Sequence, residues 1–128
     1  MPTTTETQTD SAKQFAIDAA RLLATTRCHD VNVLDVRGLS PITDFLVIAT
    51  GTSARQMRSV CEEVIELAEP RQMSPFSQSG CEGESWMLTD FIDVVVHVFN
   101  GQARLYYDLD NLWGDAKKID WAPTDAKK

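Results

Sequence analysis

The first half of the chain contains two stretches in which hydrophobic residues recur at the spacing of an α-helix. In the first, Ser11 and Gln14 form a capping-box pattern, and the apolar positions after them predict a helix that ends near residues 25–27. In the second, Ser53 and Gln56 form the same pattern, and a proline is expected to end the helix. The apolar positions of this second stretch share one helical face: Met57, Val60, Cys61, Val64, Ile65 and Ala68.

Five segments have the length and composition of β-strands: residues 31–37, 44–50, 73–79, 86–90 and 93–99. The first two are joined by a short turn, which favours an antiparallel pair. The third contains a proline and three serines, so it suits only the edge of a sheet. A tight turn at Phe91 and Ile92 joins the last two. Because the last segment, from Asp93 to Phe99, is mostly apolar on both faces, it is expected at the centre of the sheet.

The order of these elements predicts the fold class. A short helix over residues 104–113 completes the order α-β-β-α-β-β-β-α. This order predicts a single α/β (α+β) domain, in which a mixed β-sheet of about five strands is flanked by helices. The domain is expected to span residues 11–120, between a flexible N-terminal tail at 1–10 and a C-terminal tail at 121–128.

Composition and charge narrow the classes of partner. The chain has 128 residues, 43% of them hydrophobic and 24% charged, with a net charge of −7. Seven acidic residues and one base lie between positions 82 and 115, so nearly all of the net charge is in the second half. Phosphate backbones and anionic membranes would repel such a chain, which argues against direct DNA binding and membrane binding. A basic protein is the electrostatically favoured partner.

The cysteines and the hydropathy of the chain indicate its compartment. Three cysteines without paired spacing suit reduced thiols better than a disulfide framework. No apolar run approaches the roughly 20 residues of a membrane span. The first ten residues have neither an apolar core nor the arginines of a targeting segment. We therefore expect a cytoplasmic protein.

The residues that could support catalysis do not form a recognisable site. Metal sites need several converging ligands, and the two histidines, His29 and His97, have no such neighbours at metal-binding spacing. His97 lies in a valine-rich strand, where a half-buried histidine with a satisfied hydrogen bond is the better interpretation. The sequence therefore predicts no metal and no cofactor.

One motif keeps an enzymatic alternative open. Gly51-Thr52-Ser53 lies at a strand-to-helix junction, where backbone amides can bind phosphate, and it is similar to the start of nucleotidyltransferase active sites. Those enzymes also need an Asp-x-Asp on a neighbouring strand to hold magnesium. The one Asp-x-Asp of the sequence, Asp108-Leu109-Asp110, follows the last predicted strand. Ser53 is therefore interpreted as a helix cap, and the chain is expected not to be an enzyme, with a nucleotide-dependent transferase as the alternative.

Five motifs occur in order between residues 12 and 120: Asp35–Ser40, Thr43–Phe45, Gly51–Ser53, Trp86–Phe99 and Tyr107–Ala116. Each is weak alone, but all five at compatible spacing are specific. By these motifs the chain resembles the ribosomal silencing factor family, also called Iojap-like, over most of its length. It departs from the family at Ile92, in a turn where members often carry glycine, and at Ser79-Gly80, where members often have Glu-Gly.

The resemblance implies a fold and a partner. The implied fold is nucleotidyltransferase-like without catalytic carboxylates. The implied partner is the large ribosomal subunit, bound through its basic subunit-interface protein, number fourteen in that series. Binding there would sterically block joining with the small subunit and repress translation under nutrient limitation. Organellar relatives act in large-subunit assembly, so an assembly role is an alternative. A homodimer formed through the apolar edge around Trp86 is another.

Residue by residue, the resemblance implies a binding surface centred on the Trp86 strand. The residues expected to bind the partner are Trp86, Leu88, Asp90, Phe91, Asp93, Tyr107, Asp108 and Asp115. Trp86 suits an interface anchor and a core position about equally. A structural role is expected for the other motif residues, which are Asp35, Arg37, Thr43, Asp44, Gly51, Ser53, His97 and Trp113. Side chains of the first four are expected to form hydrogen bonds that hold the turn around the first two strands.

Overall fold

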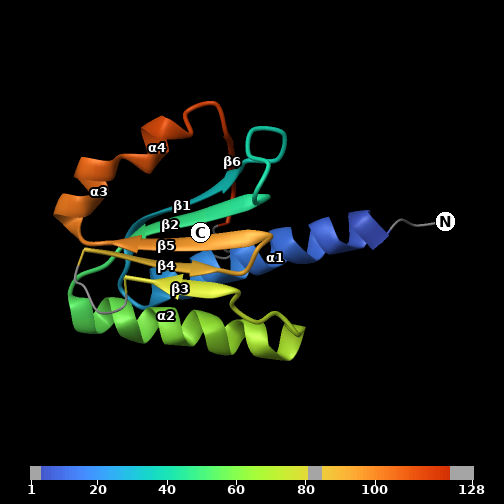
Figure 1. Cartoon of the computed structure of the whole chain (residues 1–128). Coiled ribbons are helices and arrows are strands. Elements are labelled where there is room, and N and C mark those ends of the chain that lie inside the picture. Colours follow the sequence, from blue (N-terminus) through green and yellow to red (C-terminus); the bar gives the residue numbers. More distant parts are fainter. Residues whose placement is uncertain (1–3, 81–84, 122–128) are drawn as a thin grey trace, which may run out of the picture.

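A computed structural model of the chain describes residues 4–80 and 85–121, and the elements within them are shown in Figure 1. The helices are α1 (Thr4–Thr25), α2 (Ala54–Ala68), a 3₁₀ turn (Glu69–Arg71), α3 (Gly101–Tyr107) and α4 (Leu109–Leu112). The strands are β1 (His29–Asp35), β2 (Phe45–Thr50), β3 (Ser77–Ser79), β4 (Trp86–Asp90), β5 (Val94–Phe99) and β6 (Lys117–Ile119). They confirm the predicted mixed α+β domain. No helix within these ranges is long and apolar enough to span a membrane.

The six strands form one open sheet in the order β3-β4-β5-β2-β1-β6. β2 and β5 pair in parallel, and every other neighbouring pair is antiparallel. The predicted antiparallel pairing of the first two strands is therefore confirmed. So are the central position of β5, which is buried along its whole length, and the edge position of β3, which is exposed.

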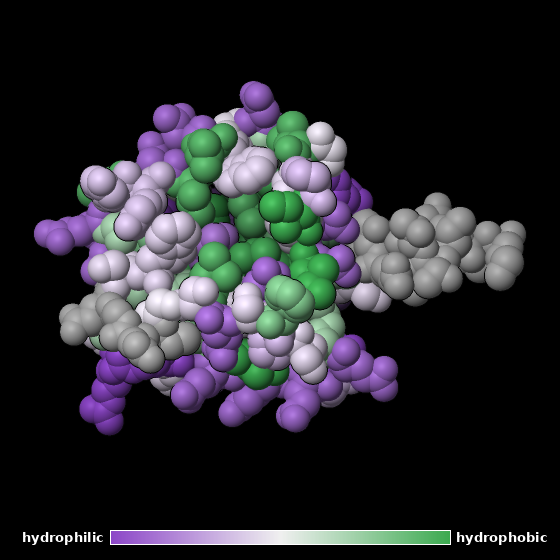
Figure 2. All heavy atoms as spheres, viewed as in Figure 1, coloured by the Kyte–Doolittle hydropathy of each residue, from purple (hydrophilic) through white to green (hydrophobic). Residues whose placement is uncertain are grey.

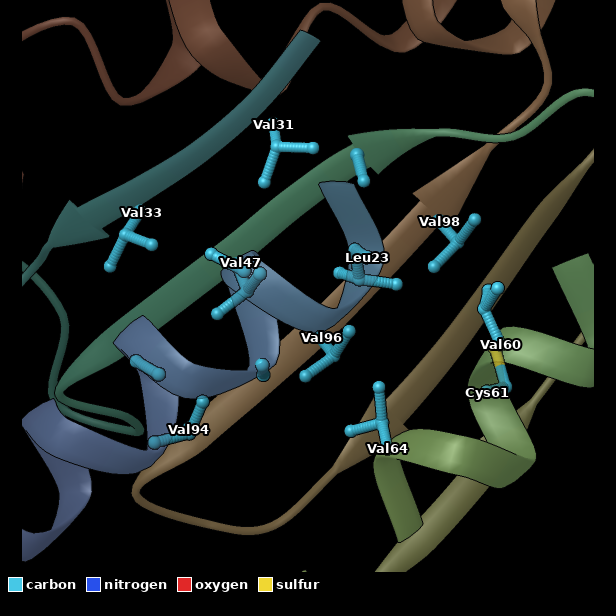
Figure 3. Packing of buried hydrophobic residues seen from close by; sticks show 14 of the residues in the cluster. Leu23, Val31, Val33, Val47, Val60, Cys61, Val64, Val94, Val96 and Val98 are labelled. Atoms are coloured by element: carbon cyan, nitrogen blue, oxygen red, sulfur yellow. The ribbon is translucent and has the colours of Figure 1, made fainter. Parts of the chain in front are cut away.

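Two hydrophobic layers cover the faces of the sheet. Val94, Val96 and Val98 point to the face that carries α1 and α2, and Figure 3 shows them beside side chains from both helices. Val95 and Phe99 point to the opposite face, where α3 and α4 contribute Ala103 and Leu109. Complete burial of a side chain of this size contributes about 1.5–3 kcal/mol. The alternation along β5 thus decides which helices pack on which face.

The first helix starts earlier than the sequence predicted. The start at Ser11 is wrong, because α1 already begins at Thr4. No glycine or proline lies between these positions, so nothing in the backbone stops the helix from continuing past the capping-box pattern. The predicted apolar face is nevertheless correct, since Phe15, Ala19 and Leu23 are buried.

The C-terminal part of the fold also differs from the prediction. The sheet has a sixth strand, β6, which pairs antiparallel with β1. The predicted helix over residues 104–113 is two short helices, separated at Asp108 by a left-handed backbone (φ 48°). Trp121, the first residue of the expected C-terminal tail, is half-buried, and its indole N–H donates to the carbonyl of Val31 at 3.0 Å. Residues 1–3 and 122–128 of the expected tails lie outside the described residues.

Candidate functional site

Trp86 belongs to an aromatic cluster at one end of the sheet. Its ring stacks on Phe99 at a centroid distance of 5.0 Å and lies 4.6 Å from the ring of Tyr107. Its indole Nε1 donates a hydrogen bond to Nδ1 of His97 at 3.0 Å. Trp86 is half-buried, so its position lies between the two predicted alternatives, core and surface. Its indole N–H is hydrogen-bonded within the protein, and part of its ring faces solvent.

His97 has the internal role that the sequence predicted. The side chain is buried between β2 and β4, and this burial lowers its pKa to about 4. The imidazole is therefore neutral at pH 7, and its Nδ1 is available to accept the indole proton of Trp86. The predicted hydrogen bond of His97 is present, and the side chain is buried more completely than the half-buried position that the sequence predicted.

The alternate residues of β4 form a row along the face of the sheet that α1 and α2 leave uncovered. Trp86, Leu88 and Asp90 are each half-buried, and the first two pack against the hydrophobic cluster beneath α3 and α4. Because side chains alternate along a strand, Asp90 shares their face. The row joins the aromatic cluster at one end of the sheet to the β4–β5 turn at the other.

Two of the predicted binding residues, Phe91 and Asp93, lie at that turn, and they differ in exposure. Phe91 is buried, and its ring meets that of Phe15 on α1 at 5.0 Å, edge to face. It therefore belongs to the core on the α1 side and offers almost no surface to a partner. Asp93 is exposed at the same turn. Partial burial and the neighbouring carboxylate of Asp44 raise the pKa of Asp93.

The remaining predicted residues lie on or beside the last two helices. Tyr107 is 44% exposed, and Asp108 and Asp115 are exposed. Trp113 is half-buried against the hydrophobic cluster of this face. Sequence reasoning missed three exposed apolar side chains of α3 and α4, namely Leu105, Tyr106 and Leu112. The run Leu105-Tyr106-Tyr107 could have revealed them, because three consecutive helical residues cannot all face one core.

The turn between β1 and β2 has the predicted side-chain hydrogen bonds at Asp35 and Arg37 but not at Thr43. The guanidinium of Arg37 donates to both carboxylate oxygens of Asp35, at 2.9 and 2.6 Å, and these bonds lower the pKa of Asp35. The hydroxyl of Ser40 accepts from the backbone N–H of Ile42 and of Thr43. Asp44 takes part through its backbone, since its carbonyl accepts from the N–H of Val36. The buried hydroxyl of Thr43 has no hydrogen-bond partner among the described residues.

The junction between β2 and α2 serves as a helix cap. The hydroxyl of Ser53 accepts from the N–H of Gln56, and the side-chain carbonyl of Gln56 accepts from the N–H of Thr52, both at 3.0 Å. A phosphate at this junction would have to displace the Gln56 side chain. A Cβ at Gly51 would lie 2.3 Å from Cγ of Met57, so glycine is required here for packing. In residues 4–80 and 85–121, no group of three or more His, Cys, Asp or Glu side chains could hold a metal ion.

Comparisons with known proteins agree on one family. Residues 9–128 match a family described as "Ribosomal silencing factor during starvation". The chain is 36% identical to ribosomal silencing factor RsfS of Bacillus subtilis over 94 residues, which cover 73% of this chain and 80% of the relative. It is 37% identical to the protein of the same name from Treponema pallidum over 107 residues, which cover 82% and 95%. A crystal structure of a Chromobacterium violaceum protein matches with a TM-score of 0.73 and 30% identity, covering 92% of this chain and 95% of that one.

Proposed function

This chain belongs to the ribosomal silencing factor family, and on that premise we propose that it binds the large ribosomal subunit and blocks joining of the small subunit. The proposed contact is the basic subunit-interface protein, number fourteen in the large-subunit series. By occupying that protein, the chain would repress translation when nutrients are scarce. We assign it no catalytic step. The backbone N–H groups of Thr52 and Gln56, which a phosphate would need, already donate hydrogen bonds to the side chains of Gln56 and Ser53.

The observation that carries this proposal is the row of half-buried side chains on the face of the sheet opposite α1 and α2. Trp86 and Leu88 supply apolar contact area, and Asp90 adds a carboxylate at the end of the row. Interface anchors are typically aromatic side chains surrounded by a polar rim, and this arrangement has that composition. The face is free of α1 and α2, so a protein partner can reach it (Figure 1).

Exposed carboxylates at both ends of the row favour a basic partner. Asp93 lies at the β4–β5 turn, and Asp108 follows Tyr107, whose ring lies on Trp86 at the other end of the row. Asp115 lies apart from the row, near Asp35 and Arg37 of the β1–β2 turn. With a net charge of −7, the chain as a whole also attracts cations. Charges at the rim of an interface mainly speed association and make it sensitive to salt, while the apolar centre supplies most of the affinity. The partner is therefore expected to present basic side chains around an apolar area.

Charge neutralisation on this face tests the proposal. The double variant Asp93→Asn, Asp108→Asn removes two exposed negative charges and is expected to weaken co-sedimentation with isolated large subunits by about tenfold at low salt, since each surface ion pair contributes up to about 1 kcal/mol. The matched control is Glu62→Gln, Glu66→Gln, which removes two charges from exposed positions of α2 on the other side of the molecule. Equal binding by both double variants would show that the partner does not use this face.

A further inference from the structure

The turn between β4 and β5 has an unusual backbone at Ile92. The N–H of Asp93 donates to the carbonyl of Phe91 at 3.0 Å, which closes a three-residue turn around Ile92. The φ angle of Ile92 is 76°, in the region that glycine adopts freely and a β-branched residue rarely does. Three-residue turns with this φ are rare and strained. The chain thus keeps an isoleucine at a position where glycine would cost less.

Neighbouring groups force the turn to keep this conformation. The carboxylate of Asp90 accepts from the N–H of Ile92 at 2.7 Å, and the N–H of Phe91 donates to the carbonyl of Val94 at 2.8 Å. The ring of Phe91 is fixed in the core against Phe15. Strained residues persist where their surroundings over-determine them, and they concentrate at functional sites. The side chain of Ile92 is nevertheless 53% exposed, so burial within this chain does not account for it.

Ile42 and Phe76 are among the other exposed apolar side chains at the same end of the sheet. Ile42 is 77% exposed and Phe76 is 71% exposed. The backbone brings them to the turn, because the N–H of Phe76 donates to the carbonyl of Asp90 and the N–H of Asp44 donates to the carbonyl of Asp93. We call Ile42, Phe76 and Ile92 the end patch. Figure 2 shows hydrophobic side chains gathered where β2 begins, at the β4–β5 turn and where β3 begins.

The rim of the end patch is acidic. Asp44, Asp90 and Asp93 lie in the segments that carry the patch, and two of their carboxyl groups are close enough for Asp44 to raise the pKa of Asp93. The nearest base on the β1–β2 turn is Arg37, and its guanidinium is held by Asp35. These carboxylates complement an apolar surface bordered by lysines or arginines.

We propose that Ile92 is an apolar anchor for the basic large-subunit protein, and that the end patch is a specificity-determining part of that interface. This inference rests on the proposed function and deepens it, because it adds Ile42, Phe76 and Ile92 to a surface first placed on β4 and α3–α4. The strained turn at Ile92 presents an isoleucine to the partner at the centre of an acidic rim. The residue contributes to binding and not to folding.

The variant Ile92→Gly separates binding from folding. Glycine adopts the positive φ without strain, which offsets its greater freedom in the unfolded chain, so the midpoint of thermal unfolding is expected to stay the same or rise. Removal of the side chain is expected to weaken binding to isolated large subunits by about tenfold, as is typical of a central apolar contact. Affinity would thus fall without a loss of stability, which a merely structural residue would not produce.

Arg27→Gly is the matched control. Arg27 is exposed and also has a positive φ of 77°, but it lies at the opposite end of the sheet, just before β1. Its replacement relieves the same backbone strain and makes the chain more acidic. It is therefore expected to leave binding to a basic partner unchanged or slightly stronger.

The outcomes distinguish this inference from the function on which it rests. If the unchanged chain does not bind large subunits, the proposed function and the anchor role both fail. If the unchanged chain binds and Ile92→Gly binds equally well, the anchor role alone is overturned. It is also overturned if Ile92→Gly lowers the unfolding midpoint and affinity together, or if the variant abolishes only a self-association seen by native mass measurement.

Discussion

A single hydrogen bond between the side chains of Trp86 and His97 fixes the largest side chain of the proposed surface. The indole proton needs a neutral Nδ1 as its acceptor, and burial of His97 keeps that nitrogen unprotonated by lowering its pKa to about 4. Stacking on Phe99 holds the same ring from another side. The exposed part of Trp86 is therefore held in one orientation, which would lower the entropic cost of ordering it at the proposed interface.

This bond leads to a prediction about pH. The unfolded chain binds a proton to His97 below its ordinary pKa of 6.5, whereas the folded chain does so only below about 4. The free energy of unfolding should therefore fall as the pH drops from about 6.5 to about 4, by up to about 3 kcal/mol from this residue. Urea unfolding across this range measures the loss. His97→Gln, which still offers an acceptor to Trp86, should lack that part of the slope, and an unchanged slope would contradict the assignment.

Among the elements, α2 is the one that the sequence defined most completely. Its buried residues Met57, Val60 and Val64 lie on the predicted face, and Ser53 caps it as expected. Gln56, the other half of the predicted capping box, bonds to the N–H of Thr52 instead of that of Ser53. Its amide also donates to the carbonyl of Thr26, at the end of α1. The side chain of Gln56 thus connects the start of α2 to the end of α1, a contact that the capping-box pattern could not indicate.

The same junction gives a prediction for Gly51. Gly51→Ala would bring a Cβ to 2.3 Å from the buried side chain of Met57, so we expect the free energy of unfolding to fall by about 1–3 kcal/mol. Gly101→Ala is the control, because a Cβ there meets nothing within 4 Å at the first residue of α3. It should be neutral or slightly stabilising. If thermal unfolding shows the same change for both variants, packing against Met57 is not what requires glycine at the junction.

At the scale of the whole molecule, the segment that follows α4 connects the C-terminal part of the fold to α1 and β1. β6 adds a strand to β1, and Trp121 is tied to both of the first two elements of the chain. Its indole N–H donates to the carbonyl of Val31 in β1, and its carbonyl accepts from the side chain of Arg21 in α1 at 2.7 Å. These contacts link residues about a hundred positions apart.

Trp121 should therefore contribute to global stability. Trp121→Ala removes half-buried ring packing and a hydrogen bond, and the expected loss in the free energy of unfolding is about 2 kcal/mol. Trp121→Phe keeps most of the ring and loses the hydrogen bond, so about 1 kcal/mol is expected. Chemical denaturation of both variants checks the order. Stabilities equal to that of the unchanged chain would mean that the residue lies outside the cooperative unit.

The sequence by itself determined the features that depend on neighbours along the chain. These are the apolar faces of α1 and α2, the alternation that makes β5 central, and the motifs that mark the family. It could not reveal β6, because three residues, two of them lysines, carry no strand pattern until β1 offers its edge. The buried position of Phe91 and the internal bond of Trp86 were likewise decided by side chains from other elements.

The end patch shows the same division most clearly. Ile42, Phe76 and Ile92 come from three separate segments, and each is an unremarkable single apolar residue in the sequence. Only backbone hydrogen bonds between the β1–β2 turn, the start of β3 and the β4–β5 turn bring them to one end of the sheet. The periodicity of apolar residues along the chain indicates which side chains are buried. A surface shared by distant segments exists only once the strands have paired, because pairing sets the relative positions of those segments.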